Sequence, residues 1–309
     1  MCRFMPDPEN DRIVRCYTDW STQYYELWSA DKTGDLAPHL RRLHEFVEEA
    51  QPRTLLDAGC GPASFLRTLD PEKIDCYGFD LTPSMIDEGR AILAKKGVGG
   101  ERLWVDDVVR FADRPSGESG HGLPAYDMIV CAGVLNHIDE SDEENAVRGL
   151  IAALEPGGTL VLHARNAYFS LFTANRHSSD YVIDQLAAMK ALKDRAGSER
   201  AALEAIEADW KSHFSQHEPP ARETVADGAG YDDIRNRFHD PLSLQNLCME
   251  AGLTGCRLVY SNYHPVPPMY AGRIPVLFRD IAAEMEKSRD PRGLIMASSF
   301  FVIGTRPGA

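Results

Sequence analysis

Short apolar runs alternate along this chain with longer stretches in which apolar residues recur at helical spacing. Runs of this kind separated by helices are typical of an α/β fold, and an apolar run without polar alternation fits a strand buried on both faces of a parallel sheet. We therefore predict an open, largely parallel sheet. The expected strands begin near Leu55, Asp75, Arg102, Tyr126, Thr159, Cys256 and Ser298.

Helical spacing predicts the elements that join these strands. Residues 12–28 are dense in aromatic side chains, and a second helix is expected at 36–49. Further helices are expected at 143–154, 241–251 and 274–287. We divide the chain into an N-terminal helical cap (1–52), a core (53–166), a helical insertion (167–238) and the C-terminal part of the sheet with an inserted helix (239–309, helix 274–287). The insertion is expected to form a lid over the site or, alternatively, an arm for a homodimer.

Composition narrows the function classes. The 309 residues are 43% hydrophobic, spread too evenly for a membrane span, and the formal charge is −14 with no run of Lys or Arg. Such a surface repels a polyanion, so nucleic acid is not the expected partner. The seven cysteines form no CxxC pair and no metal-ligand pattern, and the N-terminus has no apolar stretch after a basic start. We expect a reduced, cytoplasmic protein that does not bind a membrane or a metal.

Candidate chemistry begins where the first strand ends, at Asp57-Ala-Gly59-Cys-Gly61. Glycines let the backbone turn sharply and approach a ligand, and the crevice after such a strand is where open parallel sheets bind nucleotides. The apolar pattern that resumes at Phe65 predicts a helix directly after the loop. A tight turn without a ligand is the alternative interpretation.

The order acid-x-Gly-x-Gly resembles motif I of class I S-adenosylmethionine (SAM) dependent methyltransferases. In that family the glycine loop packs against the methionine half of SAM and the acid, here Asp57, helps hold its ammonium group. The segment Asp80–Ile86 resembles the family's D-x-S/T-x-x-M-I, and Pro156-Gly-Gly resembles its turn into strand five. The resemblance implies a Rossmann-like sheet of seven strands in the order 3-2-1-4-5-7-6, with strand seven antiparallel, and an SN2 transfer of the methyl group.

By the same resemblance Asp80 holds the ribose of SAM and Met85 lies near the adenine face. Asp107 would contact the adenine amino group and the N–H of Val108 a ring nitrogen, with Asp106 as the alternative acid. An exposed acidic turn is the simpler interpretation of this segment. The other positions expected at the cofactor are Gly59, Gly61, Leu81, Cys131, Ala132 and Tyr17.

The segment after strand four indicates the class of acceptor. Nucleic-acid amino-methyltransferases of this fold carry an Asp/Asn-Pro-Pro-aromatic loop there, whereas this chain has Cys131-Ala-Gly-Val. The arrangement resembles small-molecule enzymes whose loop runs into a histidine, here His137. That histidine is a candidate base, or alternatively it pins the loop onto the following helix.

Strand five ends in His163-Ala-Arg165-Asn166, at the edge of the sheet that faces the crevice. His163 is the first candidate for the base, because imidazole accepts protons near neutral pH. Arg165 and Asn166 are expected to bind the acceptor, since a guanidinium suits a planar anion, although a salt bridge between loops would also explain Arg165. The other candidate acceptor contacts are Tyr168, Phe172, Tyr24, His239 and His264.

The sequence thus predicts a SAM-dependent methyltransferase that acts on oxygen or nitrogen of a small metabolite. A C-methyltransferase and a non-catalytic SAM-binding protein are the alternatives. A nicotinamide-dependent oxidoreductase is disfavoured by Asp57, by Ser64 within the loop and by the Pro-Gly-Gly turn.

Overall fold

The fold is given by a computed structural model, which describes residues 8–28, 37–111, 125–214 and 234–308. For residues 20–28 it describes the backbone only. The predicted acceptor contact of Tyr24 therefore lies outside the described side chains.

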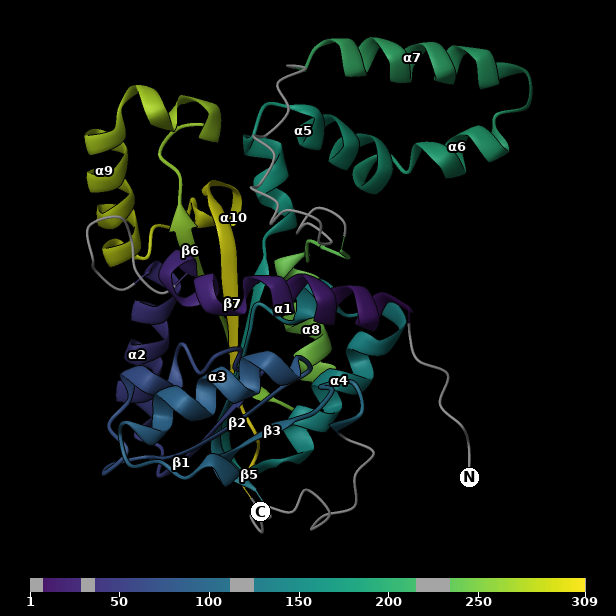
Figure 1. Ribbon diagram of the computed structural model, residues 1–309. Coiled ribbons are helices and arrows are strands. Elements are labelled where there is room, and N and C mark those ends of the chain that lie inside the picture. Colours follow the sequence, from purple (N-terminus) through teal and green to yellow (C-terminus); the bar gives the residue numbers. More distant parts are fainter. Residues whose placement is uncertain (1–7, 29–36, 112–124, 215–233, 309) are drawn as a thin grey trace, which may run out of the picture. The chain divides into compact units, whose positions relative to one another are not determined.

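The strands form one sheet of seven in the order β3-β2-β1-β4-β5-β7-β6, with β7 antiparallel to its neighbours (Figure 1). This confirms the predicted fold class and strand order. Gly157 and Gly158 exchange main-chain hydrogen bonds with Arg306 at the start of the β5–β7 pair. The strands are β1 (Thr54–Ala58), β2 (Asp75–Asp80), β3 (Leu103–Val105), β4 (Tyr126–Ala132), β5 (Leu154–Arg165), β6 (Thr254–Tyr263) and β7 (Ala297–Thr305).

The centre of the sheet is parallel and fully buried. β1 lies between β2 and β4, with Leu55 opposite Met128 and Asp57 opposite Val130. Leu55, Met128 and Val130 have no exposed surface. Because both faces of these strands are covered, their sequences are continuously apolar rather than alternating.

Local sequence signals account for several helix ends. Pro38 occupies the first turn of α2, where a missing N–H costs nothing, and Gln51 ends the helix in the left-handed region. The side chains of Asp139 and Asp240 accept hydrogen bonds from the first-turn N–H groups of α4 and α8. The helices of the first 165 residues and of residues 234–259 are α1 (Pro8–Trp28), α2 (Pro38–Ala50), α3 (Pro83–Ala94), α4 (Glu140–Ala152) and α8 (Pro241–Glu250).

The helix predicted after the glycine loop does not form. After β1 the chain makes turns and a single 3-10 turn, η1 (Leu66–Thr68), and then reaches Pro71. Ala63 has a φ of +57°, in the left-handed region that an α-helix does not tolerate. The apolar residues Phe65, Leu66 and Leu69 are buried all the same, which explains why their pattern was helix-like.

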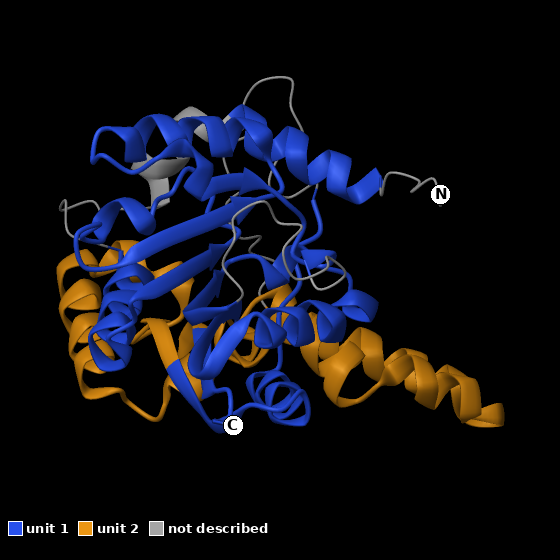
Figure 2. Ribbon diagram, turned by 90° about the horizontal axis from the view of Figure 1, so that it is seen from below, with its two compact units in different colours: residues 1–165, 222–259, 300–309 blue, residues 166–221, 260–299 orange. Residues whose placement is uncertain are grey.

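Contacts divide the chain into two compact units, coloured in Figure 2. Unit 1 contains residues 1–165, 222–259 and 300–309, and unit 2 contains residues 166–221 and 260–299. The division into cap, core, insertion and C-terminal part stays a prediction.

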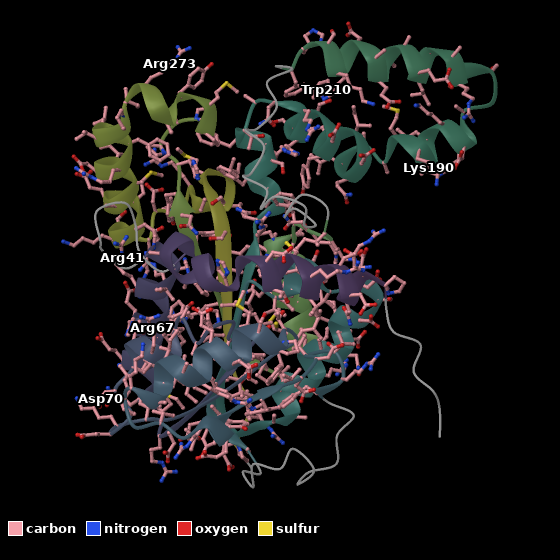
Figure 3. All side chains as sticks on the ribbon, in the orientation of Figure 1. Arg41, Arg67, Asp70, Lys190, Trp210 and Arg273 are labelled. Carbon is pink, nitrogen blue, oxygen red and sulfur yellow. The ribbon has the colours of Figure 1, made fainter. Side chains whose placement is uncertain are left out.

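Unit 2 is helical apart from the ends of β6 and β7. α6 and α7 are in contact, and the Lys193 ammonium bonds the Glu207 carboxylate between them. The predicted pair of helices is therefore present, while its role as lid or arm stays a prediction. Trp210 of α7, labelled in Figure 3, is 40% exposed. The helices of unit 2 are α5 (Arg176–Asp180), α6 (Met189–Arg195), α7 (Arg200–Ser212), α9 (Pro275–Ser288) and α10 (Gly293–Met296).

None of the helices in the described parts of the chain is long and apolar enough to cross a membrane. The six cysteines within the described ranges are free thiols.

Candidate functional site

The glycine loop is fixed between the ends of β2 and β4. The N–H groups of Gly59 and Cys60 both donate to the carbonyl oxygen of Phe79 in β2, at 2.8 and 2.9 Å. Gly59 has a φ of +84°, and a Cβ built on it would lie 2.1 Å from a methyl group of Val134, which follows β4. Both the backbone conformation and the close approach therefore require glycine at this position.

Asp80, at the end of β2, holds the second half of this loop. Its carboxylate accepts hydrogen bonds from the N–H of Gly61 at 2.9 Å and from the N–H of Thr82 at 2.8 Å. Burial raises the pKa of Asp80, and these hydrogen bonds counteract the increase. Each carboxylate oxygen keeps a second lone pair, so Asp80 retains the capacity to accept further hydrogen bonds, and its bonds to ribose hydroxyls stay a prediction.

Asp57 is the second acid of the site and is 4% exposed. Burial, and then the negative charge of Asp80, raise its pKa to about 7. Within the described part of the chain neither carboxylate has a cationic side chain as a partner. A buried acid beside a second, partly buried acid is costly without a counter-ion, and a ligand that carries an ammonium group would supply the missing charge. The donor set therefore fits the predicted cofactor, SAM.

The acids after β3 are organised by their own turn. Asp106 is buried and accepts from the indole N–H of Trp104 at 3.2 Å and from the N–H of Asp107 at 2.8 Å. Asp107 is only partly buried and accepts from the side-chain amide of Asn10 in α1 at 3.3 Å and from the N–H of Val109 at 3.0 Å. Between the two candidates, Asp107 is the more accessible one for adenine.

The other predicted cofactor residues lie along the same edge of the sheet. Val108, Met85 and Cys131 are buried, and Ala132 ends β4 with partial exposure. Leu81, directly after β2, and Tyr17 of α1 pack against the same small cluster of Ile13, Cys16 and Ile234. The edge formed by the carboxyl ends of β1, β2, β3 and β4 thus brings the predicted cofactor residues together, while their contacts with SAM stay predictions.

His137 lies in the 3-10 turn η4 (Leu135–His137) after β4, and both of its ring nitrogens have partners. Nε2 is 2.9 Å from the hydroxyl of Tyr17, and Nδ1 is 2.6 Å from the carbonyl oxygen of Arg235. The histidine thus joins η4 to α1 and to residue 235, not to the following helix α4 as the alternative interpretation expected, and its role as a base stays a prediction.

His163 has the opposite environment. It lies opposite Ala132 of β4, with its ring 4.6 Å from that of Phe301 and stacked at 6.0 Å on that of His39 in α2. Neither ring nitrogen has a hydrogen-bond partner in the described structure. Burial, and then the nearby His39 and Arg165, lower its pKa to about 3. A group of such low basicity is a poor proton acceptor at neutral pH, so the structure gives His163 little support as the base.

Arg165 and His239 meet at the end of β5. The N–H of Arg165 donates to the side chain of Asn136 at 3.3 Å, and its carbonyl accepts from the N–H of His239 at 2.8 Å. The guanidinium lies 5.8 Å from the ring centre of Phe238. His239 is buried and lies 3.1 Å from the carboxylate of Glu143 in α4. His239 therefore anchors residues 234–239 in place of its predicted contact with the acceptor, whereas the role of Arg165 at the acceptor stays a prediction.

Sequence reasoning missed how residues 234–239 are held. Arg237 donates to the carboxylate of Glu143 at 2.7 Å and to the carbonyl of Ile138 at 3.1 Å. Burial alone would raise the pKa of Glu143, but the bond to His239 and the charge of Arg237 lower it. These partners are more than ninety residues apart in the sequence, and no local pattern indicates such a contact.

Three of the predicted acceptor residues lie in unit 2 with Asn166. The Asn166 amide donates to the carbonyls of Leu294 and Ala297 at 2.9 and 2.8 Å, and its oxygen accepts from the N–H of Tyr168 at 3.0 Å. Asn166 is fully buried, and these bonds leave it without a free donor, so the prediction that it binds the acceptor is not supported. The role of Tyr168, Phe172 and His264 at the acceptor stays a prediction. In unit 2 Tyr168 packs against Tyr181, Phe172 packs against Phe169, and the ring of His264 lies beside those of Phe169 and Phe278.

No group of three or more His, Cys, Asp or Glu side chains in the described residues is arranged to hold a metal ion.

Comparison with known proteins identifies the family. The profile of the methyltransferase domain family matches residues 33–258, and the chain therefore belongs to that family. The chain is 14% identical to the magnesium protoporphyrin IX methyltransferase of Synechocystis, solved with S-adenosylhomocysteine, with a TM-score of 0.50 over 96% of this chain and 99% of that one. The predicted class is thus confirmed: the chain carries a SAM-dependent methyltransferase domain, whose cofactor is SAM.

A curated relative is the ubiquinone biosynthesis O-methyltransferase of Bordetella avium. It is 26% identical over 144 residues, which cover 47% of this chain and 56% of the relative. The chain thus aligns with little more than half the length of that relative.

Proposed function

We propose that this protein transfers the methyl group of SAM to an oxygen atom of a small molecule. The observation that carries the proposal is the pair of acids beside the glycine loop, the buried Asp57 and the partly buried Asp80, which have no cationic partner in the described structure. Family membership supports SAM as the cofactor, and the O-methyltransferase relative supports oxygen as the atom that is methylated.

In this proposal Asp57 binds the ammonium group of the cofactor and Asp80 binds its ribose hydroxyls. Asp107 and the N–H of Val108 bind the adenine. When bound beside these residues, SAM would supply an electrophilic methyl group. The protein contributes alignment of the acceptor oxygen with that carbon in a site that excludes water, which is worth several kcal/mol in such reactions.

A small molecule is the proposed acceptor for two reasons. The loop Cys131–Val134 lacks the Asp/Asn-Pro-Pro-aromatic sequence that stacks a flipped base. The formal charge of −14 opposes the approach of a polyanion. Arg165, at the end of β5, is the proposed contact for an anionic group of the acceptor.

Binding is tested by calorimetric titration of SAM and of NAD into the protein and into Asp80→Ala. We expect SAM to bind and NAD not to bind. Asp80→Ala should weaken the affinity for SAM by about 1–3 kcal/mol, because it leaves ligand hydroxyls unpaired. The matched control is Asp75→Ala, which removes an acid from the other end of the same strand, where it pairs with Arg102 at the surface. Wild-type affinity in Asp80→Ala would reject Asp80 as the ribose ligand.

Transfer is tested with SAM labelled in its methyl group and a panel of phenols, alcohols and amines. We expect label in methyl ethers. Label found only in amines or on carbon would contradict the proposal of oxygen. Binding of SAM without transfer to any member of the panel would favour a SAM-binding protein without catalytic activity.

A further inference from the structure

Tyr17 and His137 form a hydrogen-bonded pair, and the carbonyl oxygen of Arg235 determines where its protons lie. The carbonyl oxygen of Arg235, 2.6 Å from Nδ1 of His137, can only accept a hydrogen bond. Nδ1 therefore carries the hydrogen. In the neutral ring Nε2 then has the lone pair, and it accepts the hydrogen bond from the Tyr17 hydroxyl at 2.9 Å.

The pair lies near the point at which the strand order of the sheet reverses. β1 is flanked by β2 and β4, and open α/β sheets bind ligands at the carboxyl ends of the strands at such a point. Tyr17 and Leu81, directly after β2, pack against the same small cluster of Ile13, Cys16 and Ile234, and Tyr17 bonds His137, shortly after β4. Tyr17 therefore lies close to residues that follow β2 and β4, the two neighbours of β1. α1 is held there by further contacts with α3, beside which it runs in Figure 1, including the bond between Thr18 and Ser84.

We propose that Tyr17 and His137 act together as the base that takes the proton of the acceptor hydroxyl. The inference rests on the proposed function. The phenolic oxygen of Tyr17 receives the acceptor proton while its own proton moves to Nε2 of His137. The acceptor oxygen uses the freed electron pair to bond the methyl carbon, and the carbon–sulfur bond breaks with its electron pair on sulfur. The reaction thus ends with one proton on His137, which is released to solvent.

The surroundings of His137 suit this role. When Nε2 gains a proton, Nδ1–H keeps its bond to the carbonyl of Arg235, so the ring does not have to turn. The guanidinium of Arg235 is compensated by the carboxylate of Asp139 at 3.1 Å, and its main-chain N–H is bonded to the carboxylate of Glu9 in α1 at 2.6 Å. The charge of Arg235 is thus paired with a carboxylate, which limits its repulsion of the imidazolium that forms.

The test is a series of phenols of rising acidity, from phenol through 4-chlorophenol to 4-nitrophenol, with SAM at saturation. Tyr17→Phe keeps the ring and removes the hydroxyl. We expect kcat for phenol to fall by about 10²-fold or more, which is the usual contribution of a general base. With 4-nitrophenol, which ionises by itself at neutral to alkaline pH, the loss should be much smaller. His137→Gln should show the same dependence on phenol acidity.

Two controls separate this chemistry from a structural role. Tyr263→Phe removes another tyrosine hydroxyl bond, to the carbonyl of Asp290 at 2.7 Å, and His44→Gln changes another bonded histidine. Neither should change the dependence of kcat on phenol acidity. Nitrogen NMR of the protein without ligands should show His137 as the Nδ1–H tautomer, and Tyr17→Phe should shift its Nε2 resonance.

Three results would overturn the inference. The first is that kcat of Tyr17→Phe falls by the same factor with every phenol. The second is that Tyr17→Phe retains the wild-type kcat. The third is an Nε2–H tautomer of His137 in the NMR spectrum. If the wild-type protein methylates no hydroxyl compound, the proposed function itself has failed. That result differs from one in which the wild type methylates phenols but Tyr17 and His137 do not act as the base.

Discussion

Replacing Asp57 by asparagine should stabilise the protein and weaken its binding of SAM. Burial and the charge of Asp80 raise the pKa of Asp57 from 3.8 to about 7. Each pKa unit corresponds to about 1.4 kcal/mol, so at pH 8 the ionised carboxylate costs the folded state about 4 kcal/mol. The amide avoids this cost but buries N–H groups without partners, at about 1–3 kcal/mol. We expect Asp57→Asn to raise the free energy of unfolding by about 2 kcal/mol at pH 8.

The sign of the pH dependence is fixed by proton binding. Between pH 4 and 7 the folded protein holds a proton on Asp57 and the unfolded chain does not, so the wild type loses stability as the pH rises through this range. The advantage of Asp57→Asn should therefore shrink by about 1.4 kcal/mol for each pH unit below 7, vanish near about pH 5.5 and reverse below it, where the cost of the unpartnered amide remains. Urea titrations at several pH values measure it, with the exposed Asp87→Asn as the control.

Ligand binding supplies the second measurement. SAM should bind the ionised form of Asp57, so its affinity for the wild type should rise with pH up to about 7 and then level off. Calorimetry below pH 7 in two buffers of different ionisation enthalpy should detect proton release. Asp57→Asn should bind SAM about tenfold more weakly or worse, since a charged hydrogen bond is worth about 1.5–3 kcal/mol. A variant with unchanged stability at pH 8 and wild-type affinity for SAM would refute the reasoning.

Two further predictions concern the packing of the site. Gly59→Ala should lower the free energy of unfolding by more than Gly97→Ala, because both glycines have positive φ but only the Cβ at position 59 meets Val134, at 2.1 Å; equal losses in thermal unfolding would contradict the close approach. His163→Phe should flatten the pH dependence of stability between pH 6.5 and 4. In this range the unfolded chain protonates His163, whereas the folded protein, in which the pKa of His163 is lowered to about 3, does not. An unchanged slope in urea titrations would show that the folded imidazole is protonated in this range.

Local signals in the sequence were enough for the central sheet and for the glycine loop. The continuous apolar runs of β1 and β4 predict strands buried on both faces, and the strand order agrees with the fold that the motifs imply. The positive φ of Gly59 and Gly61 likewise follows from residue type, since glycine reaches that region without strain. The helix expected after the loop failed because its apolar residues are buried through turns, which periodicity does not distinguish from helix over so short a segment.

The chemistry of the candidate site was only partly accessible from the sequence. The sequence by itself determined which residues lie at or just after the strand ends. The positions of Asp57, Asp80 and His137 follow directly from the apolar runs that precede them in the chain. Only the tertiary structure decided the hydrogen bonding and the pKa of the side chains at these ends. It removed the hydrogen-bond partners of His163 and lowered its pKa, whereas it gave His137 a carbonyl on one nitrogen and the Tyr17 hydroxyl on the other. Desolvation and hydrogen bonds between distant segments set basicity, and neither has a signature in the order of residues.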